Sequence, residues 1–260
     1  MSGPSSIANK LIAAEDYART YLVDMAFEEH LITARQDRCL EFLDACQPRS
    51  MLEVGCGPDL LIDRFDLAGS AIAQWMVVEP SFYADTIAAR MAGCDKIGLC
   101  RGYLEERIDV LLEACPGGYD AVLLSGLLHE TANPAFMLEA TFTLMRPGGH
   151  LFVSVPNAHS FHRLLGLELG MMQAPTELSE RNVALGQPVV FHRQSLEALV
   201  EASGFANCQF SGYMLKPFSN AQMGSVIESI GSDVVEGLNR LGRRFPEQAA
   251  EIAVTARKPD

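Results

Sequence analysis

Short apolar runs recur along the chain and alternate with segments of helical periodicity. Five of these runs are MLEV (51–54), WMVVE (75–79), KIGLC (96–100), YDAVLLS (119–125) and HLFVSV (150–155). Short apolar runs that alternate with helices are typical of parallel strands covered on both faces. Two later runs, at 207–215 and 251–258, predict two more strands. The pattern predicts an α/β fold with a doubly wound sheet.

Helical segments are predicted before and after these strands. From about Ala13 to Leu43 the pattern indicates helices, because Tyr17, Tyr21 and Met25 recur at i, i+4 spacing. We therefore expect residues 1–45 to form an N-terminal helical cap.

Composition and charge limit the classes of function. The chain has 260 residues, is 48% hydrophobic and shows no linker or repeat, so one domain over 1–260 is expected. Its 33 acidic and 20 basic side chains give a net charge of −13, which would repel a phosphate backbone. We expect no nucleic-acid partner. No apolar run approaches the roughly 20 residues that a membrane span requires, so no membrane partner is expected either.

Seven cysteines, an odd number without CxxC spacing, indicate reduced thiols. The first ten residues contain no apolar targeting segment. Together these features predict a cytoplasmic location.

A glycine loop follows the first predicted strand in LEVGCGPDLLI (52–62). We expect this loop to open a helix at about Leu60, with its backbone N–H groups facing a ligand. About two dozen residues later the second strand ends in Glu79. Carboxyl ends of parallel strands meet at one crevice, where such a carboxylate can accept hydrogen bonds from both hydroxyls of a ribose. The pair therefore predicts a nucleoside site.

The third glycine of a dinucleotide-binding loop is missing. Pro58 and Asp59 stand where it would be expected. The Asp59 charge would oppose a diphosphate and would favour a cation. A cationic sulfonium nucleoside therefore fits this loop better than NAD.

Five successive motifs carry a family resemblance. They are EVGCG (53–57), Glu79-Pro80, YDAVLLSGLLHETANP (119–134), MRPGGHLFVSVPN (145–157) and FHRQSLEALVEASGF (191–205). Over about Met51 to Lys258 the chain resembles class I S-adenosylmethionine-dependent methyltransferases, most closely the small-molecule branch. The resemblance implies a Rossmann-like, mostly parallel seven-stranded sheet whose last strand is antiparallel. It also implies S-adenosylmethionine as cofactor and methyl transfer to an O, N or C nucleophile of a small molecule by in-line displacement.

The resemblance also assigns cofactor positions. Those around the methionine moiety would be Glu53, Gly55, Gly57 and Asp59, the ribose would lie at Glu79 and Pro80, and the sulfonium end at Ser125 and Gly126. The adenine would lie against Gly102, Tyr103 and Leu104. Many relatives carry an acidic residue where this chain has Tyr103, which would instead stack or bond through its hydroxyl.

Candidates for proton transfer follow the fourth predicted strand. His129 and Glu130 lie where the acceptor pocket would open, and an unperturbed histidine titrates near neutrality. His159 is the alternative base. A purely structural hydrogen bond of His129 to the backbone is the competing interpretation.

The connection at 157–193 is longer than a strand-to-helix connection requires and is predicted to form a lid. It contains His159, His162, Arg163, Arg181, His192 and Arg193, and among these His162, Arg163 and His192 are candidates to bind substrate. The same donors would serve equally well to bond the lid to the core. No third ligand completes the HxxH pair at 159–162, so no metal is expected. Tyr17 and Tyr21 are predicted to close over the cofactor from the N-terminal helix and to be candidates for binding substrate, or to pack without function.

Two other functions remain open from the sequence alone. One is an NAD(P)-dependent oxidoreductase, which Pro58-Asp59 disfavours, and the other is a non-catalytic scaffold that has kept the methyltransferase fold. The identity of the acceptor and the formation of a homodimer are also left open.

Overall fold

A seven-stranded sheet forms the centre of the molecule, for which we describe residues 13–21 and 27–260 of a computed structural model. The strands are β1 (Ser50–Val54), β2 (Gln74–Glu79), β3 (Ile97–Arg101), β4 (Tyr119–Ser125), β5 (Met145–Pro156), β6 (Ala206–Tyr213) and β7 (Glu251–Arg257). Their order is β3-β2-β1-β4-β5-β7-β6, and β7 is antiparallel to both neighbours. The remaining pairs are parallel, which confirms the predicted fold class.

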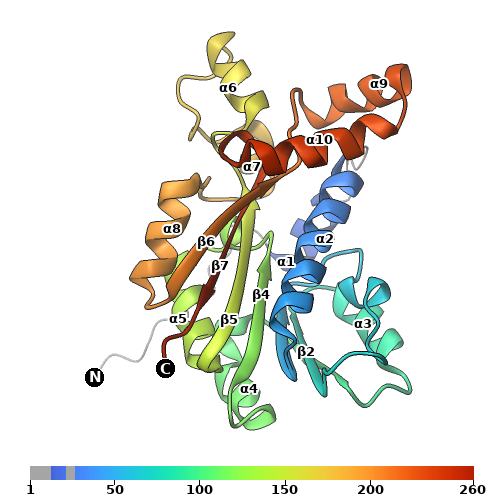
Figure 1. Cartoon of the computed structure of the whole chain (residues 1–260), viewed down its shortest axis with the longest axis vertical. Coiled ribbons are helices and arrows are strands. Elements are labelled where there is room, and N and C mark those ends of the chain that lie inside the picture. Colours follow the sequence, from blue (N-terminus) through green and yellow to red (C-terminus); the bar gives the residue numbers. More distant parts are fainter. Residues whose placement is uncertain (1–12, 22–26) are drawn as a thin grey trace.

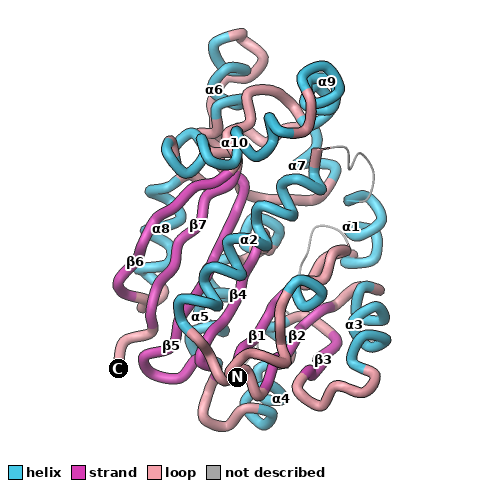
Figure 2. Tube along the Cα trace, turned by 45° about the vertical axis from the view of Figure 1, so that its right-hand side comes forward, coloured by secondary structure: helices cyan, strands magenta, loops and turns pink. Residues whose placement is uncertain are grey.

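Helices cover both faces of this sheet (Figures 1 and 2). They are α1 (Ala14–Tyr21), α2 (Glu28–Cys46), α3 (Tyr83–Met91), α4 (Ile108–Ala114), α5 (Pro134–Leu144), α6 (Phe161–Glu168), α7 (Glu180–Ala184), α8 (Arg193–Ala202), α9 (Asn220–Ile230) and α10 (Asp233–Arg244). Alternate strand residues serve the two faces: Met51 and Leu123 pack with α2, α3 and α10, whereas Leu52 and Leu124 pack with α4, α5 and α8. This two-sided burial explains the continuous apolar runs of the sequence. Across the described residues, no helix has the length and apolar character that crossing a membrane requires.

The helix expected to begin at about Leu60 is the main error of the sequence prediction. The structure has only a 3-10 turn there, Leu61–Arg64, and Phe65 already has an extended backbone with φ −107° and ψ 131°. The Asp66 carboxylate accepts a hydrogen bond from the Gly69 N–H at 3.0 Å, a local turn that competes with helix formation. The glycine loop therefore offers its ligand no α-helix N-terminus.

Residues 157–193 leave the sheet at the end of β5 and return to it at Phe191, which forms a bridge with Asn157. Between these points lie α6 and α7. Figure 1 shows α6, α7, α9 and α10 together at the end of the molecule toward which β4 and β5 run. This arrangement brings the segment to the carboxyl ends of the central strands, where open α/β sheets bind their ligands.

Candidate active site

A cavity opens at the carboxyl ends of β1, β2 and β4, with a volume of about 1350 Å³ that includes its open mouth. Its walls come from α1, α2, the loop after β1, the turn after β2, the segment after β3 and the residues after β4. All the cofactor positions assigned by resemblance line it: Glu53, Gly55, Gly57, Asp59, Glu79, Pro80, Gly102, Tyr103, Leu104, Ser125 and Gly126. Strand order alone brings these distant segments to one edge.

The loop after β1 depends on its two glycines. Gly55 and Gly57 have φ of +75° and +65°, a left-handed conformation that side chains with a Cβ rarely adopt. The Gly55 N–H donates to the Val78 carbonyl at 2.8 Å, which attaches the loop to β2. The chain can therefore turn sharply beside the cavity without blocking it.

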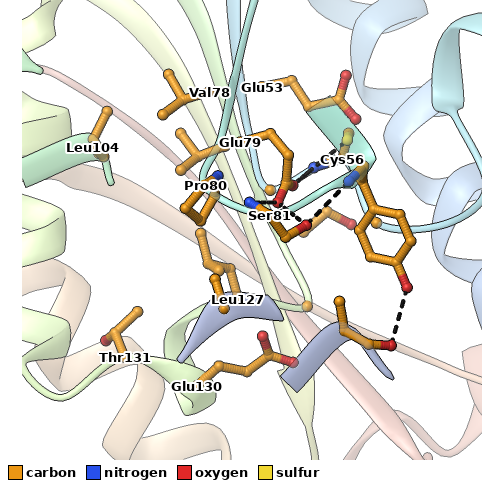
Figure 3. Close-up of a pocket in the computed structure, with 18 of the residues that line it drawn as sticks. Glu53, Cys56, Val78, Glu79, Pro80, Ser81, Leu104, Leu127, Glu130 and Thr131 are labelled. Carbon is orange, nitrogen blue, oxygen red and sulfur yellow. Dashed lines mark hydrogen bonds between the residues drawn. The ribbon is translucent and has the colours of Figure 1, made fainter. Parts of the chain in front are cut away.

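Glu79 ends β2 and is held by four hydrogen bonds (Figure 3). Its carboxylate accepts from the Cys56 N–H at 3.1 Å and the Cys56 thiol at 3.5 Å, and from the Ser81 N–H at 2.9 Å and hydroxyl at 2.6 Å. With 5% of its surface exposed, the side chain has little freedom. A carboxylate oriented in this way can accept further hydrogen bonds on its remaining lone pairs.

Glu53, on β1, lies beside Glu79 in the same wall. Its carboxylate accepts a hydrogen bond from the Trp75 indole N–H at 2.9 Å. Burial raises the pKa of Glu53 to about 7; the Trp75 hydrogen bond opposes this rise and the charge of Glu79 adds to it. Ionisation of Glu53 therefore becomes easier when a cation enters the cavity.

The cavity as a whole is acidic. Its lining contains the carboxylates of Glu53, Asp59, Glu79, Glu105 and Glu130, and its only described basic side chain is Arg35. The Arg35 guanidinium is itself paired with Glu251 at 2.8 Å. Such a lining favours a cationic ligand and opposes a diphosphate.

The wall opposite Glu79 is formed after β4. Gly126 has a φ of +65°, and its N–H donates to the carbonyl and the hydroxyl of Ser154 at 2.9 and 3.0 Å. A Cβ on Gly126 would lie 3.0 Å from the Arg35 guanidinium. The Cys39 thiol of α2 donates to the Ser125 hydroxyl at 3.4 Å. Small residues are thus needed at this wall because α2 approaches it closely.

Helix α1 covers one side of the cavity. The Tyr17 hydroxyl contacts the Glu130 carboxylate and accepts a hydrogen bond from the Gln187 amide at 3.5 Å. Tyr83 donates to the Ala18 carbonyl at 3.3 Å. Tyr17 therefore lines the cavity, whereas the side chain of Tyr21 lies outside the described part of the structure.

Glu130 and His129 occupy different environments although they are adjacent. Both belong to a 3-10 turn, Leu128–Glu130. Glu130 lines the cavity, whereas His129 is 5% exposed and does not line it. The His129 Nε2 atom lies 3.6 Å from the Glu130 carboxylate. The histidine thus lies behind the carboxylate relative to the cavity.

The predicted donors of the 157–193 segment do not line the cavity. The ring of His159 stacks on that of His192 at 4.8 Å, and the His192 Nδ1 atom lies 2.8 Å from the Gln194 amide oxygen. Arg163 donates to the carbonyls of Pro175 and Glu177 and so stabilises the segment itself. Burial, with Lys216 and Arg163 nearby, lowers the pKa of His162 to about 2.

Some residues of the cavity were not predicted from the sequence. Ser81 follows Glu79 by two residues, a spacing typical of a local side-chain turn. This contact could therefore have been predicted from the sequence. Gln36 donates to the Asp59 carbonyl at 2.8 Å, and Arg35 and Cys39 also come from α2. Helical periodicity indicates that such residues are partly buried but not what they face.

A doubly wound sheet with a glycine-edged cavity across its central strands defines a Rossmann-like cofactor-binding protein. The family model described as "Methyltransferase domain" matches residues 27–209, and the chain belongs to this family. The family predicted from the motifs is thereby confirmed.

Curated relatives and solved structures agree with this membership. A ubiquinone biosynthesis O-methyltransferase of Paracidovorax citrulli (strain AAC00-1) is 28% identical over 128 residues, covering 49% of this chain and 52% of the relative. The enzyme of the same name from Cupriavidus pinatubonensis is 27% identical over 163 residues, covering 60% and 63%. The chain thus spans about half the length of the first of these relatives.

Among solved structures, a SAM-dependent methyltransferase from Archaeoglobus fulgidus matches with a TM-score of 0.54 at 16% identity, covering 92% of this chain and 99% of that one. A SAM-dependent methyltransferase from Thermotoga maritima matches with a TM-score of 0.53 at 18% identity, covering 93% and 98%. At these identities the structural matches support the fold.

Proposed function

We propose that the protein binds S-adenosylmethionine in this cavity and catalyses methyl transfer to a small molecule. The observation that carries the proposal is the pairing of Glu79 with the Gly55–Gly57 loop inside an acidic cavity. A ribose would bond to Glu79, and the positively charged methionine end would lie near Glu53 and Asp59. Bound there, S-adenosylmethionine would supply a methyl group activated by a sulfonium.

An oxygen nucleophile is favoured as the acceptor because the curated relatives are named O-methyltransferases. The chain's own contribution to such a reaction is to position the acceptor, exclude water and accept the hydroxyl proton. We propose that Glu130 accepts this proton, since it lines the cavity, and that Tyr17 and His129 position its carboxylate. This assignment moves the base by one residue from His129, which the sequence favoured.

A cytoplasmic location remains part of the proposal. It is supported by the seven cysteines, all of which are free thiols in the structure.

Turnover tests the proposal directly. The protein is incubated with S-adenosylmethionine and a panel of catechols and phenols, and both S-adenosylhomocysteine and a product heavier by one CH₂ are measured. Methylated product is expected from the wild-type protein. Binding of S-adenosylhomocysteine without product from any acceptor would favour the alternative of a non-catalytic scaffold.

Two substitutions test the base. Glu130→Gln should lower turnover by about 10²–10⁴-fold, the usual contribution of a general base. His129→Gln should lower turnover less and should shift its pH profile, because His129 acts through Glu130. A larger loss in His129→Gln than in Glu130→Gln would restore His129 as the base.

A further inference from the structure

Lys216 is a buried cation with few hydrogen-bond acceptors and no ion-pair partner among the described residues. It lies on the loop between β6 and α9, and only 7% of its surface is exposed. Its ammonium donates to the Asn220 amide oxygen at 2.5 Å, and it forms no ion pair with any carboxylate of the described residues. An ammonium has three donors, so a single neutral partner leaves most of its bonding capacity unused.

Further donors from the 157–193 segment surround Lys216. Arg181 of α7 and Arg163 of α6 are close enough to act on its charge, and His162 is close to both Lys216 and Arg163. The Arg181 Nη2 and His162 Nδ1 atoms are buried and have no hydrogen-bond partner among the described residues. Native proteins rarely leave such groups without a partner, which is supplied by water, an ion or a ligand where the protein itself offers none.

The charges around Lys216 do not balance. Two carboxylates act on it, those of Glu28 and Glu251, and both also face Arg35 at 3.8 and 2.8 Å. A third carboxylate, that of Glu177, acts on Arg163. Among the described residues, four cationic side chains therefore face three carboxylates, inside a chain whose net charge is −13; the four are Lys216, Arg181, Arg163 and Arg35. Burial lowers the pKa of Lys216 to about 8, which indicates that these carboxylates do not offset its desolvation.

The position of this cluster is informative. Lys216 follows β6, Glu251 begins β7 beside the end of β5, and α6 and α7 lie above the same end of the sheet (Figure 1). Arg35 connects the two regions, since it lines the acidic cavity and pairs with Glu251. The cluster therefore lies next to the cofactor cavity, beyond the ends of β4 and β5.

We infer that the methyl acceptor carries an anionic group and that Lys216, Arg181 and His162 form the site that binds it. The inference rests on the proposed function and deepens it by naming the acceptor's class. The acidic cavity would hold the cationic cofactor, and this adjacent cluster would hold the anionic end of the acceptor. The opposite charges of the two regions would keep each ligand out of the other's place.

Thermal unfolding with matched ligands tests this inference. Hydroxylated aryl and alkyl carboxylates, the corresponding phosphate esters and the corresponding amides are added at constant ionic strength to protein saturated with S-adenosylhomocysteine. At least one anionic compound should raise the unfolding temperature by about 3 °C or more above its amide. Whether carboxylates or phosphate esters do so identifies the anion.

Two variants complete the test. Lys216→Met should lose the advantage of the anion, whereas Lys96→Met, which removes a lysine bonded to the Leu67 carbonyl far from the cluster, should keep it. The inference is overturned if no anionic compound exceeds its amide, or if the advantage persists in Lys216→Met.

A measurement without acceptor separates this inference from the proposed function. If the charge of Lys216 is in surplus, Lys216→Met should unfold at the same temperature as the wild type or higher. A decrease of about 3 °C or more would mean that Glu28 and Glu251 already balance the lysine, and would overturn the inference. Failure of the wild-type protein to bind S-adenosylhomocysteine would instead overturn the proposed function.

Discussion

Glu79 is the residue on which the cofactor site depends most, because its carboxylate joins the glycine loop to the turn after β2. Glu79→Ala should weaken S-adenosylhomocysteine binding by about 1–3 kcal/mol, the cost of losing hydrogen bonds to a charged group. Calorimetric titration measures this difference. Glu106→Ala, an exposed carboxylate just outside the cavity, serves as the matched control and should bind normally. Equal affinities of a folded Glu79→Ala protein and this control would remove Glu79 from the site.

Glu53 should make the stability of the free protein depend on pH. Its pKa is about 7 in the folded protein and near 4.3 in an unfolded chain, so the folded state holds the proton more tightly. The stabilisation is therefore present below about pH 4.5 and is lost as the pH rises through 7. Relative to Glu53→Gln, the wild-type free energy of unfolding should fall by roughly 3 kcal/mol across this window.

Urea unfolding of both proteins at pH 5 and pH 8 measures this change. If the two free energies change in parallel between these pH values, burial does not raise the pKa of Glu53 in the folded protein.

Single residues of the site could be predicted from the sequence only where a motif names them. Glu79 ends one strand and the glycines directly follow another, so the strand positions place them at the cavity. Gln36 and Arg35 reach the same cavity from a helix, and nothing in the local pattern of α2 reveals the register in which it crosses the sheet. The separation of Glu130 from His129 likewise depends on the backbone of one short turn.

The strands could be predicted to within a few residues because burial on both faces leaves a clear apolar run. The exception is β5, which begins earlier than predicted, at Met145. The helix predicted after β1 is absent. The local turn of Asp66 and Gly69 stands there instead, and Phe65 packs against Trp75 with ring centroids 5.4 Å apart. The tertiary contact could not be predicted from helix propensity, which is a weak guide where tertiary packing decides. The extra helices of residues 157–193 could be predicted as an insertion but not as neighbours of Lys216.

The 157–193 segment should respond to acceptor rather than to cofactor, because none of its residues lines the acidic cavity. Leu169 and Met171 lie in it and are 66% and 77% exposed, so chymotrypsin should cut there in the free protein. S-adenosylhomocysteine alone should leave the rate of this cleavage nearly unchanged. Addition of an acceptor found by the turnover panel should slow it several-fold.

Mass spectrometry of the fragments follows the cleavage over time. Equal protection by S-adenosylhomocysteine with and without acceptor would mean that the segment covers the cofactor instead, and no protection by either would remove its role as a cover.

The whole molecule places unlike charges side by side at one edge of a sheet. The order β3-β2-β1-β4-β5-β7-β6 brings acidic residues on or after β1, β2, β3 and β4 into one cavity, while the segments after β5 and β6 bring the basic cluster beside it. The acidic net charge of the chain predicted neither region, because their separation arises only when the strands assemble. The order of strands is therefore the feature through which this sequence defines its site.

The acidic cavity should bind a cationic nucleoside and not a dinucleotide. Calorimetric titration of the wild-type protein with S-adenosylmethionine, S-adenosylhomocysteine and NAD measures this preference. We expect saturable one-to-one binding of the first two ligands, loss of most of that affinity in Glu79→Ala, and no measurable binding of NAD. Binding of NAD with equal or higher affinity, or no binding of S-adenosylmethionine to the folded protein, would contradict it.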